Sequence, residues 1–221
     1  MLRFESNDSH RHRRVASTPI VMSATPHSML LDLRALRREL RARRRAVPRP
    51  ERRRAGLRLA SRVERAGWLS NRRRIALFLS MPEEIDTGPL LARALARGCR
   101  IHLPRVTDYR RNLMRFFPYG AGLVRGQYGI LEPGAGRPVK ATQLDVVLMP
   151  LVGFDARGNR IGMGKGYYDR ALAFRRGRPR LKLPLLAGLA FECQRVEALP
   201  AHKHDVSLDR LVTETTTRRF R

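Results

Sequence analysis

A glycine-rich stretch in the second half of the chain carries most of the residues that suit chemistry. Residues 158–170 read GNRIGMGKGYYDR, with glycines at positions 162, 164 and 166. Glycine removes the side chain where a backbone approaches a ligand closely, and free backbone N–H groups in such a loop bind anions. Arg160 and Lys165 add positive charge, and Asp169 adds a carboxylate of the kind that holds hydrated Mg²⁺. The stretch therefore favours a phosphate or nucleotide site, with a flat ring against Tyr167 or Tyr168.

This glycine loop differs from two familiar nucleotide-binding patterns. A Walker A loop requires a wider gap between its glycines and a Ser or Thr after the Lys, whereas Gly166 follows Lys165 here. The alternating glycines also differ from the dinucleotide-binding fingerprint. A glycine-rich surface turn that happens to carry a lysine remains the alternative interpretation.

Strands and helices must position this loop. The apolar run Leu144–Met149 before it predicts a buried strand, and Ala171–Phe174 after it predicts a helix. Further strands are predicted at Arg74–Leu79, Arg100–Pro104, Leu113–Phe117, Leu185–Phe191 and Leu211–Thr213, and helices at Leu30–Ala46, from Pro50 to about Ala66, and at Leu90–Ala96 with Thr87 as N-cap. The Gly- and Pro-rich residues 126–134 are expected to be irregular. The alternation predicts an α/β fold, a three-layer sandwich with a mainly parallel, Rossmann-like sheet.

The first predicted helix is rich in arginine. Leu33, Leu36 and Leu40 share one face, which indicates packing against the core. A solvated face is the simplest interpretation of most arginines around this stripe. One or two of them near the helix start are placed to reach a phosphate.

Composition limits the possible classes. The chain has 221 residues, of which 43% are hydrophobic, and no apolar run approaches a membrane span. Its net charge of +27 invites a nucleic-acid interpretation, but the sequence contains no recognisable nucleic-acid-binding module. Cys99 and Cys193 lie in apolar sequence surroundings, which indicates reduced core thiols in a cytoplasmic protein. We therefore expect no specific nucleic-acid partner and no membrane association.

The carboxylates near the C-terminus suggest a metal. His202, His204 and Asp205 resemble part of a zinc site but lack a further nearby nitrogen or sulfur ligand. Asp205 is better suited to join Asp169 at a Mg²⁺ ion.

The chain ends differ from the middle. Residues 1–28 are polar and aperiodic, which predicts a disordered arm, and residues 215–221 form a polar tail. An organelle presequence and a later translation start at Met22 or Met29 both remain open for the arm. We expect a single catalytic domain over residues 29–214 and a monomer.

Several segments together, in this order, resemble the 5-formyltetrahydrofolate cyclo-ligase family, also called 5,10-methenyltetrahydrofolate synthetase. They are Ser80–Thr87, Tyr128–Pro133, Met149–Asp155, Gly158–Asp169, Leu189–Phe191 with Gln194, then Pro200, Asp205 and Thr213–Glu214. The resemblance runs from about Leu30 to Glu214. It implies an α/β sandwich that uses Mg²⁺ and ATP, as co-substrate, to cyclise 5-formyltetrahydrofolate, polyglutamylated or not, to 5,10-methenyltetrahydrofolate with release of ADP and phosphate. It also implies that ATP phosphorylates the formyl oxygen.

The resemblance also implies roles for individual residues. In the family a Lys or Arg often precedes the helix-one arginine where this chain has Leu33, so Arg34 is expected to act there, beside Arg37. The implied catalytic residues are Lys165, Arg160 and Tyr168, and the implied metal ligands are Asp169 and Asp205. The implied nucleotide-binding residues are Arg34, Arg37, Arg160, Ile161, Gly162, Met163, Gly164, Lys165, Gly166, Tyr167 and Tyr168, and the implied folate-binding residues are Leu79, Glu84, Met163 and Tyr167.

Two other classes of protein would share some of these features. A basic nucleic-acid-binding protein would bind duplexes tightly and with strong salt dependence. A sugar-phosphate isomerase or CoA transferase of similar architecture would not require ATP. The ordered motifs, above all the glycine loop, favour the cyclo-ligase.

Overall fold

The computed structural model describes residues 26–120, 122–127, 129–178, 183–200 and 202–220. Residues 1–25 of the expected arm, and Tyr128 of the quoted motifs, lie outside these ranges. Residues 26–28, which were assigned to the arm, belong instead to the first helix, α1 (Pro26–Ala46).

A seven-stranded sheet forms the centre of the molecule, in the order β11-β10-β9-β6-β1-β2-β3. The strands from β10 to β2 in this order run parallel to one another, whereas β3 and β11 pair antiparallel at the two edges. The strands are β1 (Arg74–Ala76), β2 (Arg100–Asp108), β3 (Leu113–Pro118), β6 (Val146–Pro150), β9 (Leu185–Leu189), β10 (Arg210–Val212) and β11 (Thr217–Arg219). The predicted α/β sandwich with a mainly parallel sheet is confirmed.

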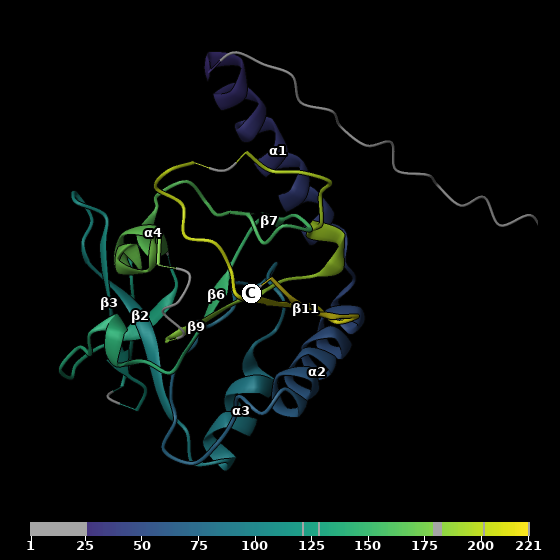
Figure 1. The fold of residues 1–221 in the computed structure, drawn as a ribbon. Coiled ribbons are helices and arrows are strands. Elements are labelled where there is room, and N and C mark those ends of the chain that lie inside the picture. The colour runs from purple at the N-terminus through teal and green to yellow at the C-terminus, as the bar shows by residue number, and fades with distance from the viewer. Residues whose placement is uncertain (1–25, 121, 128, 179–182, 201, 221) are drawn as a thin grey trace, which may run out of the picture.

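Helices cover the sheet on both sides (Figure 1). Helices α2 (Arg49–Arg65) and α3 (Gly88–Ala96) lie together on one side, and α4 (Tyr167–Ala171) lies on the other. Two buried clusters correspond to these layers, one around Leu59 and Leu90 and one around Phe116 and Leu172. Short 3₁₀ turns complete the structure at η1 (Ala141–Gln143), η2 (Ala173–Arg175) and η3 (Glu192–Gln194).

The strands that precede the Glu84 loop and the glycine loop are short. They are apolar because a central parallel strand is covered on both faces. All of Val146–Met149 is buried, as expected for a central parallel strand. β1 ends at Ala76, earlier than predicted, although the Leu77 N–H still donates to the His102 carbonyl. Thr87 stands at the N-cap of α3, but its hydroxyl donates to the Phe78 carbonyl, and Asp86 accepts from the Gly88 N–H instead.

Three segments for which the sequence analysis predicts no strand do form strands. The region expected to be irregular contains β5 (Leu131–Pro133), which pairs with β4 (Leu123–Arg125). The start of the glycine loop forms β8 (Arg160–Ile161), which pairs with β7 (Gly153–Phe154). The polar tail forms β11 at the sheet edge, and its Phe220 ring lies against Gly158.

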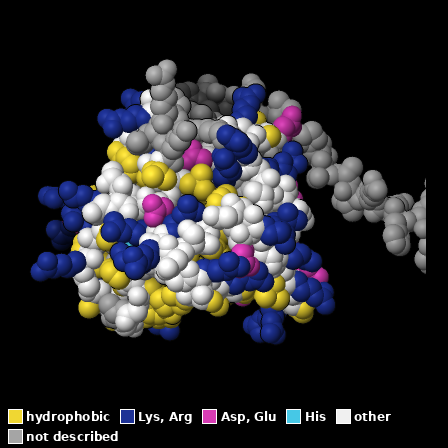
Figure 2. Space-filling model, turned by 60° about the horizontal axis from the view of Figure 1, so that its bottom comes forward, with side chains coloured by type: hydrophobic (Ala, Val, Ile, Leu, Met, Phe, Trp, Pro, Cys, Tyr) yellow, Lys and Arg dark blue, Asp and Glu magenta, His cyan; other side chains and the backbone are white. Residues whose placement is uncertain are grey.

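The surface is basic well beyond any one site. Lysine and arginine side chains are spread over the face drawn in Figure 2, with few acidic side chains between them. No helix within the described residues is long and apolar enough to cross a membrane. Because positive charge is so widespread, a binding site must be identified by its shape and contacts rather than by charge alone.

Candidate active site

The sheet has a topological switch point between β1 and β6. These strands are parallel neighbours, yet the chain continues from β1 toward β2 on one side and from β6 toward β9 on the other. Loops that leave such a point diverge and open a crevice at the carboxyl ends of the strands, where α/β proteins bind ligands. The loop after β1 carries Glu83 and Glu84, and the segment after β6 carries the glycine loop. Both predicted halves of the site therefore start from one place in the fold.

A groove of about 520 Å³ lies between α1 and the glycine loop. Its lining is almost entirely cationic on the helix side, and the loop contributes Met163 and Gly164. The helix residues that line it are Arg34, Arg37, Arg38, Arg41 and Arg45. Their spacing places them along one side of the helix. Cations held this close repel one another, so the groove favours an anionic ligand.

The apolar stripe of α1 fixes the helix beside the loop. Leu33, Leu36 and Leu40 are buried in one cluster with Ile161 of β8 and with Val152. This confirms the stripe expected from the sequence. It also turns the Ile161 side chain into the core, so that residue can offer only its backbone to a ligand.

Two arginine side chains donate hydrogen bonds to carbonyl groups of the glycine loop. Arg37 Nε donates to the Gly162 carbonyl at 2.9 Å, and Arg170 Nη1 donates to the Lys165 carbonyl at 2.6 Å. Gly164 has φ +95°, and a Cβ there would lie 3.7 Å from the Arg37 guanidinium carbon. Gly166 adopts φ +69° just before α4. These two glycines are thus required by backbone conformation, and the bound carbonyls hold the loop in one shape against α1.

Lys165 and Met163 are the exposed side chains of the loop. Met163 is 52% exposed and contributes to the groove wall. Lys165 is exposed, and its ammonium has no hydrogen-bond partner among the described residues. Both side chains are therefore accessible to a ligand.

The two predicted metal carboxylates are brought into one neighbourhood. Asp169 Oδ1 accepts from Arg160 Nη2 at 2.7 Å and from the Val206 N–H at 3.1 Å, directly beside Asp205 in the chain. Asp205 also faces Arg37, where it opposes the lowering of the Arg37 pKa that burial causes. Arg160 is buried, and its Nε has no partner within the described part of the chain. Its guanidinium is thus held by Asp169 rather than extended into the groove.

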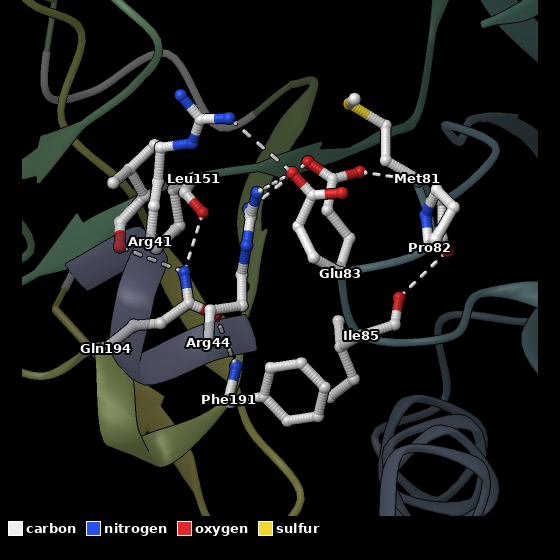
Figure 3. Close-up of polar contacts among 12 residues, drawn as sticks. Arg41, Arg44, Met81, Pro82, Glu83, Ile85, Leu151, Phe191 and Gln194 are labelled. Atoms are coloured by element: carbon white, nitrogen blue, oxygen red, sulfur yellow. Dashed lines mark hydrogen bonds and ion pairs between the residues drawn. The ribbon is translucent and has the colours of Figure 1, made fainter. Parts of the chain in front are cut away.

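The second half of the crevice expected at the switch point is the loop after β1, where a buried charge cluster forms (Figure 3). Arg44 of α1 is 2% exposed and forms ion pairs with Glu83 at 3.2 Å and with Glu84 at 3.3 Å. Glu84 Oε2 also accepts from the Met81 N–H at 3.0 Å. Burial raises the pKa of Glu84, although Arg44 opposes that shift. The predicted folate carboxylate is therefore nearly enclosed and held by two donors.

Two tyrosines follow the glycine loop directly in the chain. Tyr168 lies in a tilted ring contact with Phe116, and both Tyr167 and Tyr168 pack against the core. Burial, with the nearby Glu84 carboxylate, raises the pKa of the Tyr168 hydroxyl, and Arg160 opposes this. Tyr168 therefore stays a neutral phenol near Glu84. Leu79 is half-buried beside the same loop.

A glutamine outside the predicted site fixes the chain segment that leads into the glycine loop. Gln194 is buried, and its amide nitrogen donates to the Leu151 and Val152 carbonyls at 2.7 and 3.0 Å (Figure 3). Its Oε1 accepts from the Phe191 N–H. The chain between β6 and the glycine loop is thereby fixed to the segment after β9.

Sequence reasoning missed part of the arginine row. A solvated face was expected for most of these arginines, with one or two near the helix start at a phosphate, whereas Arg38, Arg41 and Arg45 line the groove as well. Their helical spacing from Arg34 was the available signal. Arg44 gave no such signal, since only the fold shows that it is buried.

Two smaller expectations change. Cys99 is buried as expected, but Cys193 is exposed because it lies on the surface of η3, so it is not a core thiol. No group of His, Cys, Asp and Glu side chains among the described residues is arranged to hold a metal by protein ligands alone.

A cationic groove and a glycine loop at the switch point of a parallel sheet define an α/β protein whose groove is suited to an anionic ligand. The sequence profile of the 5-formyltetrahydrofolate cyclo-ligase family matches residues 32–214, so the chain belongs to this family of enzymes. The resemblance inferred from the motifs is confirmed.

Relatives and solved structures agree with this assignment. A 5-formyltetrahydrofolate cyclo-ligase of Escherichia coli K12 is 33% identical over 79% of this chain and 96% of its own length. The mouse protein of the same name is 32% identical over 82% of this chain and 93% of its own. The structure of Aquifex aeolicus 5,10-methenyltetrahydrofolate synthetase superposes with a TM-score of 0.70 at 32% identity, covering 85% of this chain and 92% of that one.

Proposed function

We propose that this chain catalyses the cyclisation of 5-formyltetrahydrofolate to 5,10-methenyltetrahydrofolate, with Mg²⁺ and ATP, and releases ADP and phosphate. One observation carries the proposal: the arginine-lined groove lies beside a glycine loop at the same switch point as the enclosed Glu84. Such an arrangement suits a polyphosphate next to an uncharged ring with N–H donors. Membership of the family supplies the reaction.

The nucleotide is assigned to the groove. Arg34 and Arg37 face its phosphates from α1, and the backbone of Gly162–Gly166 with Lys165 faces them from the loop. Phosphoryl transfer depends on positioning and on charge neutralisation more than on covalent chemistry, and fixed cations supply both. The guanidinium of Arg160 is already held in an ion pair with Asp169. Arg160 is therefore assigned a role in fixing the loop through Asp169.

Asp169 and Asp205 fit a hydrated magnesium ion better than a closed protein cage. Asp169 keeps Oδ2 without a hydrogen-bond donor among the described residues, and Asp205 is half-exposed near Arg37. Mg²⁺ commonly uses one or two carboxylates together with substrate phosphates and water. When bound, the ion would neutralise phosphate charge.

The folate is assigned to the second half of the crevice. Glu84 accepts hydrogen bonds from the pterin, and Leu79 packs against it. Met163, Tyr167 and Tyr168 lie where the folate and the nucleotide meet. In the proposed reaction the γ-phosphoryl group moves to the formyl oxygen, which makes that oxygen a good leaving group. The neighbouring nitrogen then attacks the formyl carbon and loses its proton, and phosphate departs with the former formyl oxygen.

The test is a near-UV absorbance assay for the methenyl product. The protein is mixed with 5-formyltetrahydrofolate and Mg-ATP, with a parallel sample that lacks ATP. We expect product only in the sample with ATP. A folded protein that gives no product under these conditions would contradict the proposal, and a nucleic-acid titration across salt concentrations would then be the next test.

Further expectations go with this proposal. A monomer, a cytoplasmic location, the absence of a specific nucleic-acid partner and the single-domain boundaries at 29 and 214 stay predictions. So does the use of polyglutamylated folates, which the basic surface favours.

A further inference from the structure

Arg44 differs from the arginines around it on α1. The groove residues Arg34, Arg38 and Arg45 are exposed, whereas Arg44 is 2% exposed and points toward the loop after β1 (Figure 3). It meets Glu83 and Glu84 there, two carboxylates that are themselves 17% and 12% exposed. An enclosed cation between two shielded carboxylates is costly to desolvate, and replacing all members of such a buried charge cluster by apolar side chains is often neutral or stabilising. A role beyond stability is therefore worth testing.

The contacts of Glu84 leave it limited freedom. Arg44 Nη1 holds Oε1 at 3.3 Å, and the Met81 N–H holds Oε2 at 3.0 Å. Each carboxylate oxygen accepts more than one hydrogen bond, so both oxygens keep capacity for a substrate donor. Without Arg44, the Met81 N–H would be the one hydrogen-bond donor left to this carboxylate among the described residues.

Arg44 is itself fixed by a second arginine. Arg52 of α2 donates from Nη2 to the Arg44 carbonyl at 3.0 Å and from Nη1 to the Pro82 carbonyl at 2.9 Å. The end of α1 and the loop that carries Glu84 are thus joined through one side chain. This joint sets the position from which Arg44 reaches both carboxylates.

We propose that Arg44 is a positioning residue for the folate site, which holds the Glu84 carboxylate oriented and ionised for hydrogen bonds from the pterin. The inference rests on the proposed function, because it assumes that Glu84 contacts the folate. Arg44 does not itself touch the substrate in this scheme. It acts through Glu84.

The charged and titratable groups around Glu84 set the expected pH dependence. Arg44 faces it from α1, Glu83 from its own loop and Tyr168 from α4. Arg41 forms an ion pair with Glu83, and Arg160 lies near Tyr168. Burial raises the pKa of Glu84, and Arg44 is the nearby cation that opposes the rise. Its removal should raise the pKa of Glu84 further, so that the carboxyl becomes protonated at higher pH.

The experiment compares Arg44→Met and Arg44→Lys with Arg43→Met. Arg43 is the neighbouring arginine and pairs with Glu39 one turn earlier on α1, so its loss removes the same charge without removing an ion pair of Glu83 or Glu84. The KM for 5-formyltetrahydrofolate and that for ATP are measured from about pH 6 to about pH 9, a range that spans ordinary and strongly raised carboxyl pKa values. Wild-type turnover in the same assay tests the proposed function separately.

For Arg44→Met we expect the folate KM to rise about tenfold or more near neutral pH, with partial recovery as the pH rises, because more Glu84 is then ionised. The KM for ATP should change less than about threefold, since no groove contact is lost. Arg44→Lys keeps the charge and should shift the profile less. It also tests the proposal if Arg44→Met does not fold. A wild-type folate KM and pH profile in a folded variant, or an equal loss at every pH, would overturn the proposal.

Discussion

Two sets of arginines on α1 differ in burial and in their charged partners. Arg38 and Arg45 of the groove are exposed and make no ion pair with other described side chains, while Arg41 of the groove reaches Glu83 only at 3.7 Å. Arg44 lies on the same helix but is enclosed and bound to two protein carboxylates. The first set has charge available for a ligand, whereas the charge of Arg44 is already balanced within the protein. Residue type alone therefore does not assign a function, and burial and partners decide it.

The same difference separates the two halves of the crevice. The groove is open and cationic and should govern the nucleotide and the transfer of its phosphoryl group. The Glu84 half is enclosed and charge-balanced and should govern folate binding. Variants of each half should therefore fail in different ways.

The largest effect is expected for Lys165→Ala. Removing an exposed cation from the loop should lower kcat by a hundredfold to a thousandfold, on the order of the loss of one transition-state donor. Since the side chain is exposed, the melting temperature should not change. The exposed Lys140→Ala, outside the groove, is the matched control. Full activity of Lys165→Ala in the methenyl assay would remove Lys165 from the mechanism.

The next largest effect is expected on the free energy of unfolding, which should differ between variants of the two arginine sets. Arg44→Met leaves two shielded carboxylates without their shared cation and should reduce the free energy of unfolding by about 3 kcal/mol. Arg38→Met removes an exposed side chain and should change it by less than about 0.5 kcal/mol. Urea denaturation of both variants measures this. Equal losses would mean that burial does not distinguish the two arginines.

A smaller effect is expected for Gly164→Ala. The residue has φ +95°, so any side chain there is strained, at a cost of about 1 kcal/mol. The strain should also disturb the loop beside Arg37 and raise the KM for ATP more than the KM for folate. Gly162 has no such φ, and Gly162→Ala serves as the control. An equal effect of both substitutions would argue against a conformational requirement at Gly164.

Deletion of residues 1–21 should have no effect on activity. The segment lacks a core-forming apolar pattern, and the arginine groove begins at Arg34. Turnover by the truncated chain, compared with the full chain in one assay, checks this. Lost activity would give the arm a function.

The sequence predicted the features that depend on local pattern. The apolar stripe of α1, the continuous apolar run of β6 and the glycine loop each follow from residue spacing, and the fold confirms their placement. Asp169 and Asp205 were expected at one metal, and the Val206 amide brings them into one neighbourhood, although their role stays a prediction.

Features that depend on tertiary packing were not predictable. The burial of Arg44 follows from how α1 docks on the loop after β1, and no periodicity reports that contact. The ion pair between Arg160 and Asp169 and the inward turn of Ile161 arise in the same way. The edge strand β11 was missed because its sequence is polar, as an exposed edge allows.

The most direct test of the central claim is the binding of Mg-ATP at fixed ionic strength by calorimetry. Wild type is compared with the groove variant Arg34→Gln/Arg37→Gln and with Arg43→Met, which removes positive charge outside the groove. We expect the groove variant to bind at least about tenfold more weakly, a loss of at least about 1.4 kcal/mol, and Arg43→Met to bind like wild type. Equal weakening in both variants would contradict the account, since the nucleotide would then respond to the general charge of the chain.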